Sequence, residues 1–174
     1  RKIQICRSVQ DLKLLPKVTE GDWVKTLGFH FPGDGGEALY YIKNKGDDDI
    51  PNDADILTMR NGKLAILKES DSINYRMFGA KSDGISDDGV QIKLAHEYAN
   101  RELLPVINLS GEFWISRTND IPVKTSVQWG RTVFHIDERY NVWGVPRFNV
   151  GNDNPSLDMS NDTSLKELLI RELK

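Results

Sequence analysis

The sequence predicts a mainly β protein made of two successive units, residues 1–72 and residues 73–174. In the first unit, four short runs with strand composition follow a helix, which is typical of a small α+β domain. In the second unit, strand-like runs from Val106 onward recur about every 8–12 residues with turns between them, which indicates layers of short strands. A second helix precedes these runs.

The first unit begins with a helix predicted within residues 7–20. Ser8 is a suitable N-cap, and Pro16 ends the helix because it lacks a backbone N–H. The apolar stripe of this helix consists of Val9, Leu12 and Leu15.

Four strands complete the predicted first unit. Asn61 and Gly62 lie between the last two strands and supply the positive φ that a tight hairpin turn requires. A glycine-rich run, residues 32–36, separates the first two strands. The four predicted strands are residues 23–29, 38–42, 56–59 and 64–67.

The second unit begins near Ile73, and a tight turn predicted at residues 81–85 precedes its helix. Ser86 is the predicted N-cap, followed by Asp87 and Asp88 in the first turn, where carboxylates interact favourably with the helix dipole. Pro105 ends this helix at the latest. Its apolar positions are Val90, Ile92, Leu94, Ala95, Tyr98 and Ala99.

Short strands and turns then follow, and the chain ends in a further predicted helix. Ser164 and Glu167 form a capping box for that helix, with Leu168, Leu169 and Leu173 on one of its faces. The predicted strands before it are residues 106–109, 113–116, 127–129 and 132–136.

Composition and charge exclude several classes of function. Charged residues make up 28% of the 174 residues and the net charge is −3, so a binder of duplex nucleic acid is disfavoured. The apolar runs are too short for membrane insertion. A single cysteine, Cys6, excludes internal disulfides and cysteine-rich zinc sites. Because the chain begins at Arg1 and not at Met, we expect a trimmed chain or a piece of a longer protein.

Two polar motifs could indicate a ligand site, but neither has the residue spacing that such a site requires. Residues 33–38 match the dinucleotide pattern G-x-G-x-x-G/A, but that site requires a helix directly after the glycines, and the following residues are too few and too aromatic. The aspartates of residues 47–55 could suggest calcium, but Ile50 and Pro51 interrupt the ligand spacing. We interpret the first motif as a turn and the second as a solvated loop, and we expect no cofactor.

The histidines do not indicate a metal or catalytic site either. His30, His96 and His135 lie in separate segments, without the i, i+4 spacing that would place two ligands on one helix face. Structural roles are the simplest interpretation of all three. We therefore expect no metal ion.

Asp83, Asp87 and Asp88 form the most concentrated acidic group next to a helix. Two such carboxylates could act as the acid and the base, or nucleophile, at a glycosidic bond. Aspartates before a helix and beside a glycine are also typical turn and capping residues. Capping is the preferred interpretation.

The aromatic residues of the second unit also have two interpretations. Trp114, Trp129 and Trp143, with Tyr140, could present flat apolar faces on which sugar rings stack. Aromatic residues of strands are more often buried in the core.

Residues 78–88, which read Phe-Gly-Ala-Lys-Ser-Asp-Gly-Ile-Ser-Asp-Asp, resemble the start of the pectate-lyase-like family. The family pattern is roughly F-G-A-K-G-D-G-x-T-D-D, then a helix with an Ala/Ile face and a P-x-G-x-Y-like strand, here residues 110–115. Ser82, Gly89 and Ser110 depart from it. The resemblance implies a helix that caps a right-handed parallel β-helix, whose open end would otherwise expose unpaired strand backbone. It implies a structural capping role for Gly79, Asp83, Gly84, Ser86, Asp87 and Asp88.

Upstream, residues 9–12, 20–29 and 32–40 resemble the N-terminal domain that precedes the β-helix in bacteriophage tail spikes and tail appendages, and residues 61–67 fit its closing hairpin. The two resemblances together imply a small α+β N-terminal domain followed by the helix-capped start of a right-handed parallel β-helix. They also imply a virion location, a homotrimer, attachment to other virion proteins, and binding of host cell-surface polysaccharide by the β-helix. We expect this chain to be structural and not itself catalytic.

Two alternatives remain open. The chain could belong to a polysaccharide lyase or hydrolase whose groove begins here, with Glu112, Asp137 or Glu138 as catalytic carboxylates beside the aromatic strands. It could also belong to a bacterial cell-surface adhesin, which would fit the second unit but not the first.

Overall fold

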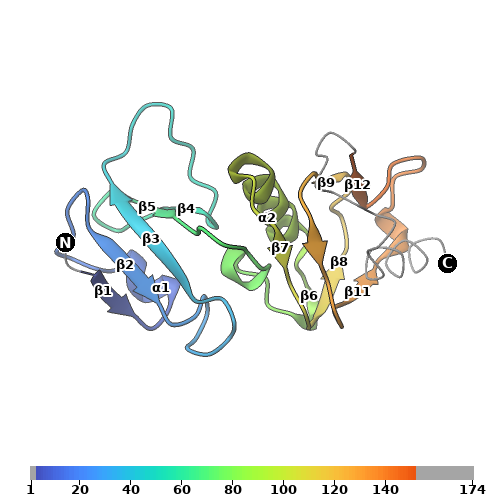
Figure 1. Ribbon diagram of the computed structural model, residues 1–174, viewed down its shortest axis with the longest axis horizontal. Coiled ribbons are helices and arrows are strands. Elements are labelled where there is room, and N and C mark those ends of the chain that lie inside the picture. The colour runs from blue at the N-terminus through green and yellow to red at the C-terminus, as the bar shows by residue number, and fades with distance from the viewer. Residues whose placement is uncertain (1–2, 152–174) are drawn as a thin grey trace. The chain divides into compact units, whose positions relative to one another are not determined.

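The computed structural model describes residues 3–151, and the chain divides into two compact units over this range. Unit 1 comprises the described residues up to Ser70 together with Arg76–Gly79, and unit 2 comprises Asp71–Tyr75 and the described residues from Ala80 onward. Both units are mainly β, with few helices (Figure 1).

Unit 1 is a five-stranded sheet with one short helix. The strand order is β1-β2-β3-β5-β4, in which β1 is parallel to β2 and the other neighbours are antiparallel. The elements are β1 (Ile3–Cys6), α1 (Val9–Lys13), β2 (Trp23–Thr26), β3 (Ala38–Lys43), β4 (Ile56–Thr58), β5 (Leu64–Leu67) and the 3-10 turn η1 (Arg76–Phe78).

Helix α1 confirms the predicted N-cap but is shorter than predicted. The Ser8 hydroxyl accepts a hydrogen bond from the Asp11 N–H at 3.2 Å. The helix ends at Lys13 because the Lys13 carbonyl accepts the N–H of Arg60 at 2.8 Å, and Pro16 has no N–H to continue the ladder. The helix therefore covers only part of the predicted range, residues 7–20, and ends before Pro16.

The predicted hairpin is confirmed. Strands β4 and β5 pair antiparallel, and Gly62 between them has a φ of 86°. Strand β1 was not predicted, because its four residues become a strand only by pairing with β2, which lies beyond α1 in the sequence.

Unit 2 contains one longer helix and seven short strands in the described range. Every strand pair in this unit is parallel. The elements are β6 (Asp83–Asp87), α2 (Gly89–Glu102), β7 (Val106–Ile107), β8 (Glu112–Ile115), β9 (Ile121–Val123), β10 (Val127–Gln128), β11 (Val133–Ile136), the 3-10 turn η2 (Glu138–Tyr140) and β12 (Phe148–Val150).

The strands after α2 repeat in groups of three. Strands β7, β8 and β9 pair in the same order with β10, β11 and β12. Val127 lies opposite Val106 and Val133 lies opposite Glu112, an offset of 21 residues in both pairs. The third pair has a longer offset because the segment with η2 lies between β11 and β12. Two successive coils of the chain therefore stack on each other.

The space between these strands is filled by aromatic residues. Phe113, Trp129, Phe134 and Phe148 are buried, and the rings of Trp129 and Phe148 meet edge to face at 5.4 Å.

Strands β9 and β12 were not predicted. Each has three residues, which is too short for a periodic pattern, and β9 also contains Pro122.

Helix α2 starts later than predicted. Residues 83–87 form strand β6, which pairs with β8, so Ser86 is not the N-cap. Asp88 occupies the N-cap position, and its N–H donates to the Trp114 carbonyl at 2.8 Å. The helix ends at Glu102, and Leu103 adopts a left-handed conformation before Pro105. The predicted helix containing Leu168, Leu169 and Leu173 lies outside the described residues.

Candidate functional site

The carboxylates of Asp83, Asp87 and Asp88, before α2, accept hydrogen bonds from backbone N–H groups of unit 2. The Asp83 carboxylate accepts hydrogen bonds from the N–H groups of Ile85 and Ser86 and from the Ser86 hydroxyl, at 2.7–2.9 Å. These hydrogen bonds lower the pKa of Asp83 to about 2. A carboxyl group with this pKa is a poor general acid at neutral pH.

Asp87 and Asp88 make contacts of the same kind. Asp87 accepts the N–H of Gly89 at 3.0 Å and that of Ser116 at 3.1 Å, and so joins the start of α2 to the end of β8. The buried Asp88 accepts the N–H groups of Lys81 and Ser82, while burial raises its pKa. The three carboxylates thus each hold a different stretch of backbone.

Two glycines of the predicted cap lie in conformations that favour glycine. Gly84, in β6, has a φ of 70°, and an added Cβ would lie 3.0 Å from Glu112 Oε2. Gly79, in unit 1, has a φ of 94°, and an added Cβ would lie 2.9 Å from the Phe29 ring. A side chain at position 79 would therefore require both a strained backbone and a shift of Phe29.

Asp137 is a buried structural residue. Its carboxylate accepts two hydrogen bonds from the Arg139 guanidinium, at 3.0 and 2.8 Å, and these lower the pKa of Asp137 to about 2. Glu138 lies exposed in η2. The two residues differ in environment although they are adjacent in sequence, and only Glu138 is open to solvent.

Arg147 has a role that the sequence did not indicate. Its side chain is buried, and its Nη atoms donate to the carbonyl oxygens of Ser116 and Thr118, at 2.7 and 2.9 Å, and of Asp137 at 2.6 Å. It therefore connects the turn after β8 with the turn after β11. No local pattern marks such a residue, because its partners are backbone atoms of distant segments.

Trp129 is not available for sugar stacking. It is 1% exposed, and its Nε1–H donates to the Tyr75 hydroxyl at 2.7 Å. The Tyr75 hydroxyl lies 2.7 Å from Nε2 of His96, and burial lowers the pKa of His96 to about 3. The imidazole is therefore neutral at pH 7, and these three residues form a hydrogen-bonded core. The prediction that Trp129 could contact glycan was wrong, because the tryptophan faces inward.

Trp114 lies on the outward-facing side of the sheet formed by β6, β8 and β11. Its ring stacks on that of His135, the residue opposite it in register, with centroids 6.2 Å apart and planes at 23°. Nε2 of His135 lies 3.6 Å from Glu112 Oε2. We call Glu112, Trp114 and His135 the outer cluster. It combines aromatic rings, which can stack on a sugar, with a carboxylate that can accept hydrogen bonds from hydroxyl groups.

Trp143 is almost fully exposed, at 98%, in the segment between η2 and β12. In the same region, the guanidinium of Arg117 lies over the Tyr140 ring, 3.8 Å from its centroid. Of the three predicted stacking tryptophans, Trp114 and Trp143 are accessible, and they lie on different segments.

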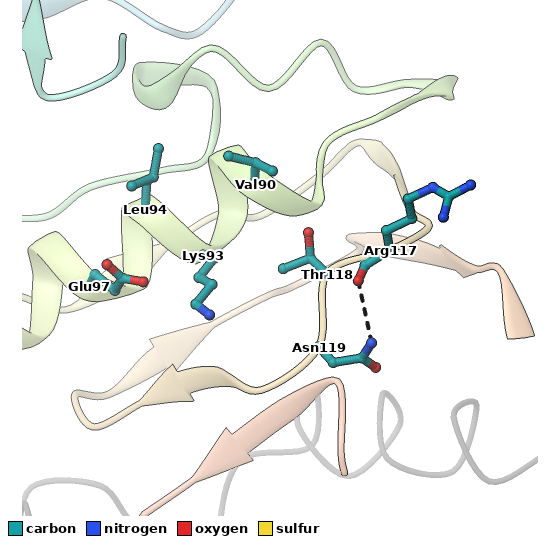
Figure 2. Close-up of a pocket in the computed structure, with 7 residues that line it drawn as sticks. All are labelled: Val90, Lys93, Leu94, Glu97, Arg117, Thr118 and Asn119. Carbon is teal, nitrogen blue, oxygen red and sulfur yellow. Dashed lines mark hydrogen bonds between the residues drawn. The ribbon is translucent and has the colours of Figure 1, made fainter. Parts of the chain in front are cut away.

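An open depression of about 390 Å³ lies beside α2, and Figure 2 shows its lining. The side chain of Lys93 is directed toward the strand side, whereas the guanidinium of Arg117 points away from Lys93. The Asn119 amide donates to the Arg117 carbonyl at 3.3 Å, the dashed line in the figure. The depression therefore does not bring its two cations together. Its lining consists of Val90, Lys93, Leu94, Glu97, Arg117, Thr118 and Asn119.

Over residues 3–151, no group of three or more His, Cys, Asp or Glu side chains is placed to hold a metal ion. In the same range, no helix combines the length and the apolar character needed to cross a membrane.

Neither a protein-family model nor a curated protein sequence matches the chain. Solved structures do match its fold. Tailspike protein 2 of an Escherichia coli O157:H7 bacteriophage has a TM-score of 0.53 and 19% identity, over 75% of this chain and 17% of its own. The tailspike of Acinetobacter baumannii phage AM24 has a TM-score of 0.53 and 19% identity, over 67% of this chain and 19% of its own.

A third match comes from a bacterium. It is a glycan biofilm modifying enzyme of Pantoea stewartii with a bacteriophage tailspike-like parallel β-helix fold. Its TM-score is 0.57 and its identity 18%, over 80% of this chain and 22% of its own. The chain thus spans about a fifth of the length of each of these three proteins. The chain has a tailspike-like fold, as the resemblance in the sequence predicted.

Proposed function

We propose that the chain is the virion-proximal part of a phage tailspike, which attaches to other virion proteins and presents a right-handed parallel β-helix that recognises host-surface polysaccharide. The observation that carries this proposal is the coil repeat, in which β7, β8 and β9 pair in order with β10, β11 and β12. The fold shared with tailspikes supports it. In this proposal, unit 1 provides the attachment and three copies form a homotrimer.

The contacts around α2 support a capping role for this helix. It lies between β6 and β7 in the chain, and Asn100 joins it to β9 by accepting the N–H of Lys124 and donating to the Pro122 carbonyl. Such a helix would cover the first coil of a β-helix and shield its unpaired backbone. Asp83, Asp87 and Asp88 would act as structural residues of this cap.

A non-catalytic role for this part of the protein is supported by Asp137. Glycoside hydrolysis commonly needs two carboxyl groups facing the same bond. The Asp137 carboxylate is buried and held by Arg139, which leaves Glu112 and Glu138 accessible. Glu112 begins β8 and Glu138 follows the end of the parallel strand β11, so the two glutamates lie at opposite ends of this strand pair.

The experiment that tests attachment is immunogold labelling of phage particles with an antibody raised against residues 7–70. We expect gold at the tail, and we expect labelling to disappear when the antibody is first adsorbed with the purified chain. Particles that contain the protein by mass spectrometry but carry gold only on the capsid would contradict the proposal.

A second candidate function is direct action on glycan by this chain, and the outer cluster favours it. If the cluster binds polysaccharide, Trp114→Ala should weaken retention of the chain on a capsular glycan column, while Phe31→Ala, at an exposed aromatic residue of unit 1, serves as the matched control. If the chain also cleaves the glycan, new reducing ends should appear and should be lost in Glu112→Gln. Release of reducing ends that depends on Glu112 would replace the non-catalytic proposal.

A further inference from the structure

One face of the five-stranded sheet of unit 1 is not covered by the other described residues of that unit. The buried face carries Val24, Tyr40 and Ile42, each 0% exposed, together with residues of β4 and β5. The alternate residues of β1, β2 and β3 lie on the opposite side, which we call the open face. The register places all of them except Lys43 in two rows, Ile3–Trp23–Tyr41 and Ile5–Lys25–Leu39.

The open face is apolar, although it faces solvent. A sheet with one solvated face normally alternates apolar residues inside with polar residues outside. Here Lys25 is the one charged member of the two rows, while Ile3 and Ile5 are 57% and 63% exposed. The rings of Trp23 and Tyr41 lie edge to face at 5.2 Å and are half-buried. Contiguous exposed apolar surface of this kind marks a protein interface.

The strand at the rim of this face is also an unprotected sheet edge. Strand β1 pairs with β2, and no strand among residues 3–151 pairs with its other side. Natural edge strands usually carry charges or proline that prevent association. Strand β1 reads Ile-Gln-Ile-Cys and has neither. The apolar face and the free edge therefore coincide.

Exposed charged residues of unit 1 favour a second copy of this chain as the partner of the open face. Lys25 is exposed and makes no ion pair within the described part of the chain. Asp47 and Asp48 form an exposed turn after β3 in the same unit and also make no ion pair there, whereas the adjacent Asp49 pairs with Lys43 at 3.0 Å. One copy of unit 1 thus offers an apolar face with a cation, and also an acidic turn that this cation could meet on another copy.

We propose that the open face of unit 1 is an interface between copies of this chain, in which Lys25 of one copy faces the turn at residues 47–48 of the next. Because the two patches differ, the contact is heterologous, and a heterologous contact closes into a ring when its rotation is that of a closed symmetry, as a three-fold rotation is for a trimer. The inference rests on the proposed homotrimer and assigns the surface through which unit 1 takes part in it.

The first test is the solution mass of the whole chain by light scattering over a concentration series. We expect the wild type to have three times the monomer mass. Ile5→Lys should raise the concentration needed for assembly by about tenfold or more, because an unpaired cation would be buried among apolar side chains. The matched control is Ile85→Lys, at a position of unit 2 that is 82% exposed, and it should leave the mass unchanged.

The second test exchanges charges. Lys25→Glu alone and Asp47→Lys/Asp48→Lys alone should each dissociate the assembly, and all three substitutions together should restore it. Far-UV circular dichroism and the melting temperature show whether each variant is folded. An assembly that keeps its mass in Ile5→Lys, or charge exchange without restoration, would overturn the inference while the proposed trimer stands. A monomeric wild type would overturn both, and immunogold labelling would still test attachment.

Discussion

Unit 1 and unit 2 are both β structures, but they bury their apolar residues in different ways. In unit 1, buried and more exposed residues alternate along the strands. One face of a mainly antiparallel sheet therefore forms the core with α1. In unit 2, strands of two to five residues in three small parallel sheets turn Phe113, Phe134 and Phe148 toward one interior. A short strand in unit 2 has little stability of its own, so each coil depends on the neighbouring coil and on buried side chains.

The first prediction concerns the aromatic interior of unit 2. Phe113→Ala should lower the free energy of unfolding of unit 2 by about 3–5 kcal/mol, because it removes a fully buried ring between two coils. Unit 1 should keep its protection in hydrogen exchange measured peptide by peptide. Trp143→Ala, at an exposed position, is the control. Equal loss of protection in both units would show that they do not respond separately.

The second prediction concerns the link between coils. Arg147→Met should destabilise unit 2 by about 3 kcal/mol, because the carbonyl oxygens of Ser116, Thr118 and Asp137 lose a charged donor. Arg131→Met is the control for loss of an exposed arginine of the same unit. Urea denaturation monitored by tryptophan fluorescence measures the difference, and similar values for the two variants would contradict the role of Arg147.

The third prediction is a pH dependence located in unit 2. His96 has a folded-state pKa of about 3, below its ordinary value near 6.5, so the unfolded state binds the additional proton between these pH values. Stability should therefore fall as the pH falls through this range, by about 2 kcal/mol between pH 6 and pH 4. Chemical denaturation of wild type and His96→Gln at both pH values tests this, and an equal slope in the two proteins would contradict it.

The smallest effect is expected in unit 1. Ser8→Ala should destabilise α1 by about 1 kcal/mol through loss of the cap to the Asp11 N–H. Ser8→Asn should retain most of the stability, because asparagine is also a good N-cap. Hydrogen exchange of peptides from α1 is the measurement, and an effect that spreads to unit 2 would argue against separate units.

The helix starts show how far local patterns could be used for prediction. Ser8 was identified because its cap partner is three residues away. Ser86 was assigned incorrectly, because pairing of residues 83–87 with β8 competes with helix formation, and β8 lies more than twenty residues later in the chain. Asp87 and Asp88 were predicted in the first turn of this helix, whereas Asp83 and Asp87 belong to β6 and Asp88 occupies the N-cap position. The backbone partners of these carboxylates became visible only in the fold.

The outer cluster also combines features that the sequence indicated with features that only the fold showed. The sequence indicated Glu112 and Trp114 as candidates, and their strand context placed them together. It did not reveal that His135 would lie beside both, since parallel pairing brings together residues 21 positions apart. It also could not separate Trp129 from Trp114, because both lie in short aromatic runs.

The sequence alone determined the β character of both units, the Asn61-Gly62 hairpin, the extent of α2 to within a few residues, and the resemblance to tail spikes, since these depend on local composition and spacing. The tertiary structure decided the parallel pairing of coils, the burial of Trp129, the backbone contacts of Arg147 and the open face of unit 1. These features depend on which distant segments meet. Contacts between distant segments depend on packing across the whole unit. Such packing produces no periodic pattern in the amino-acid sequence.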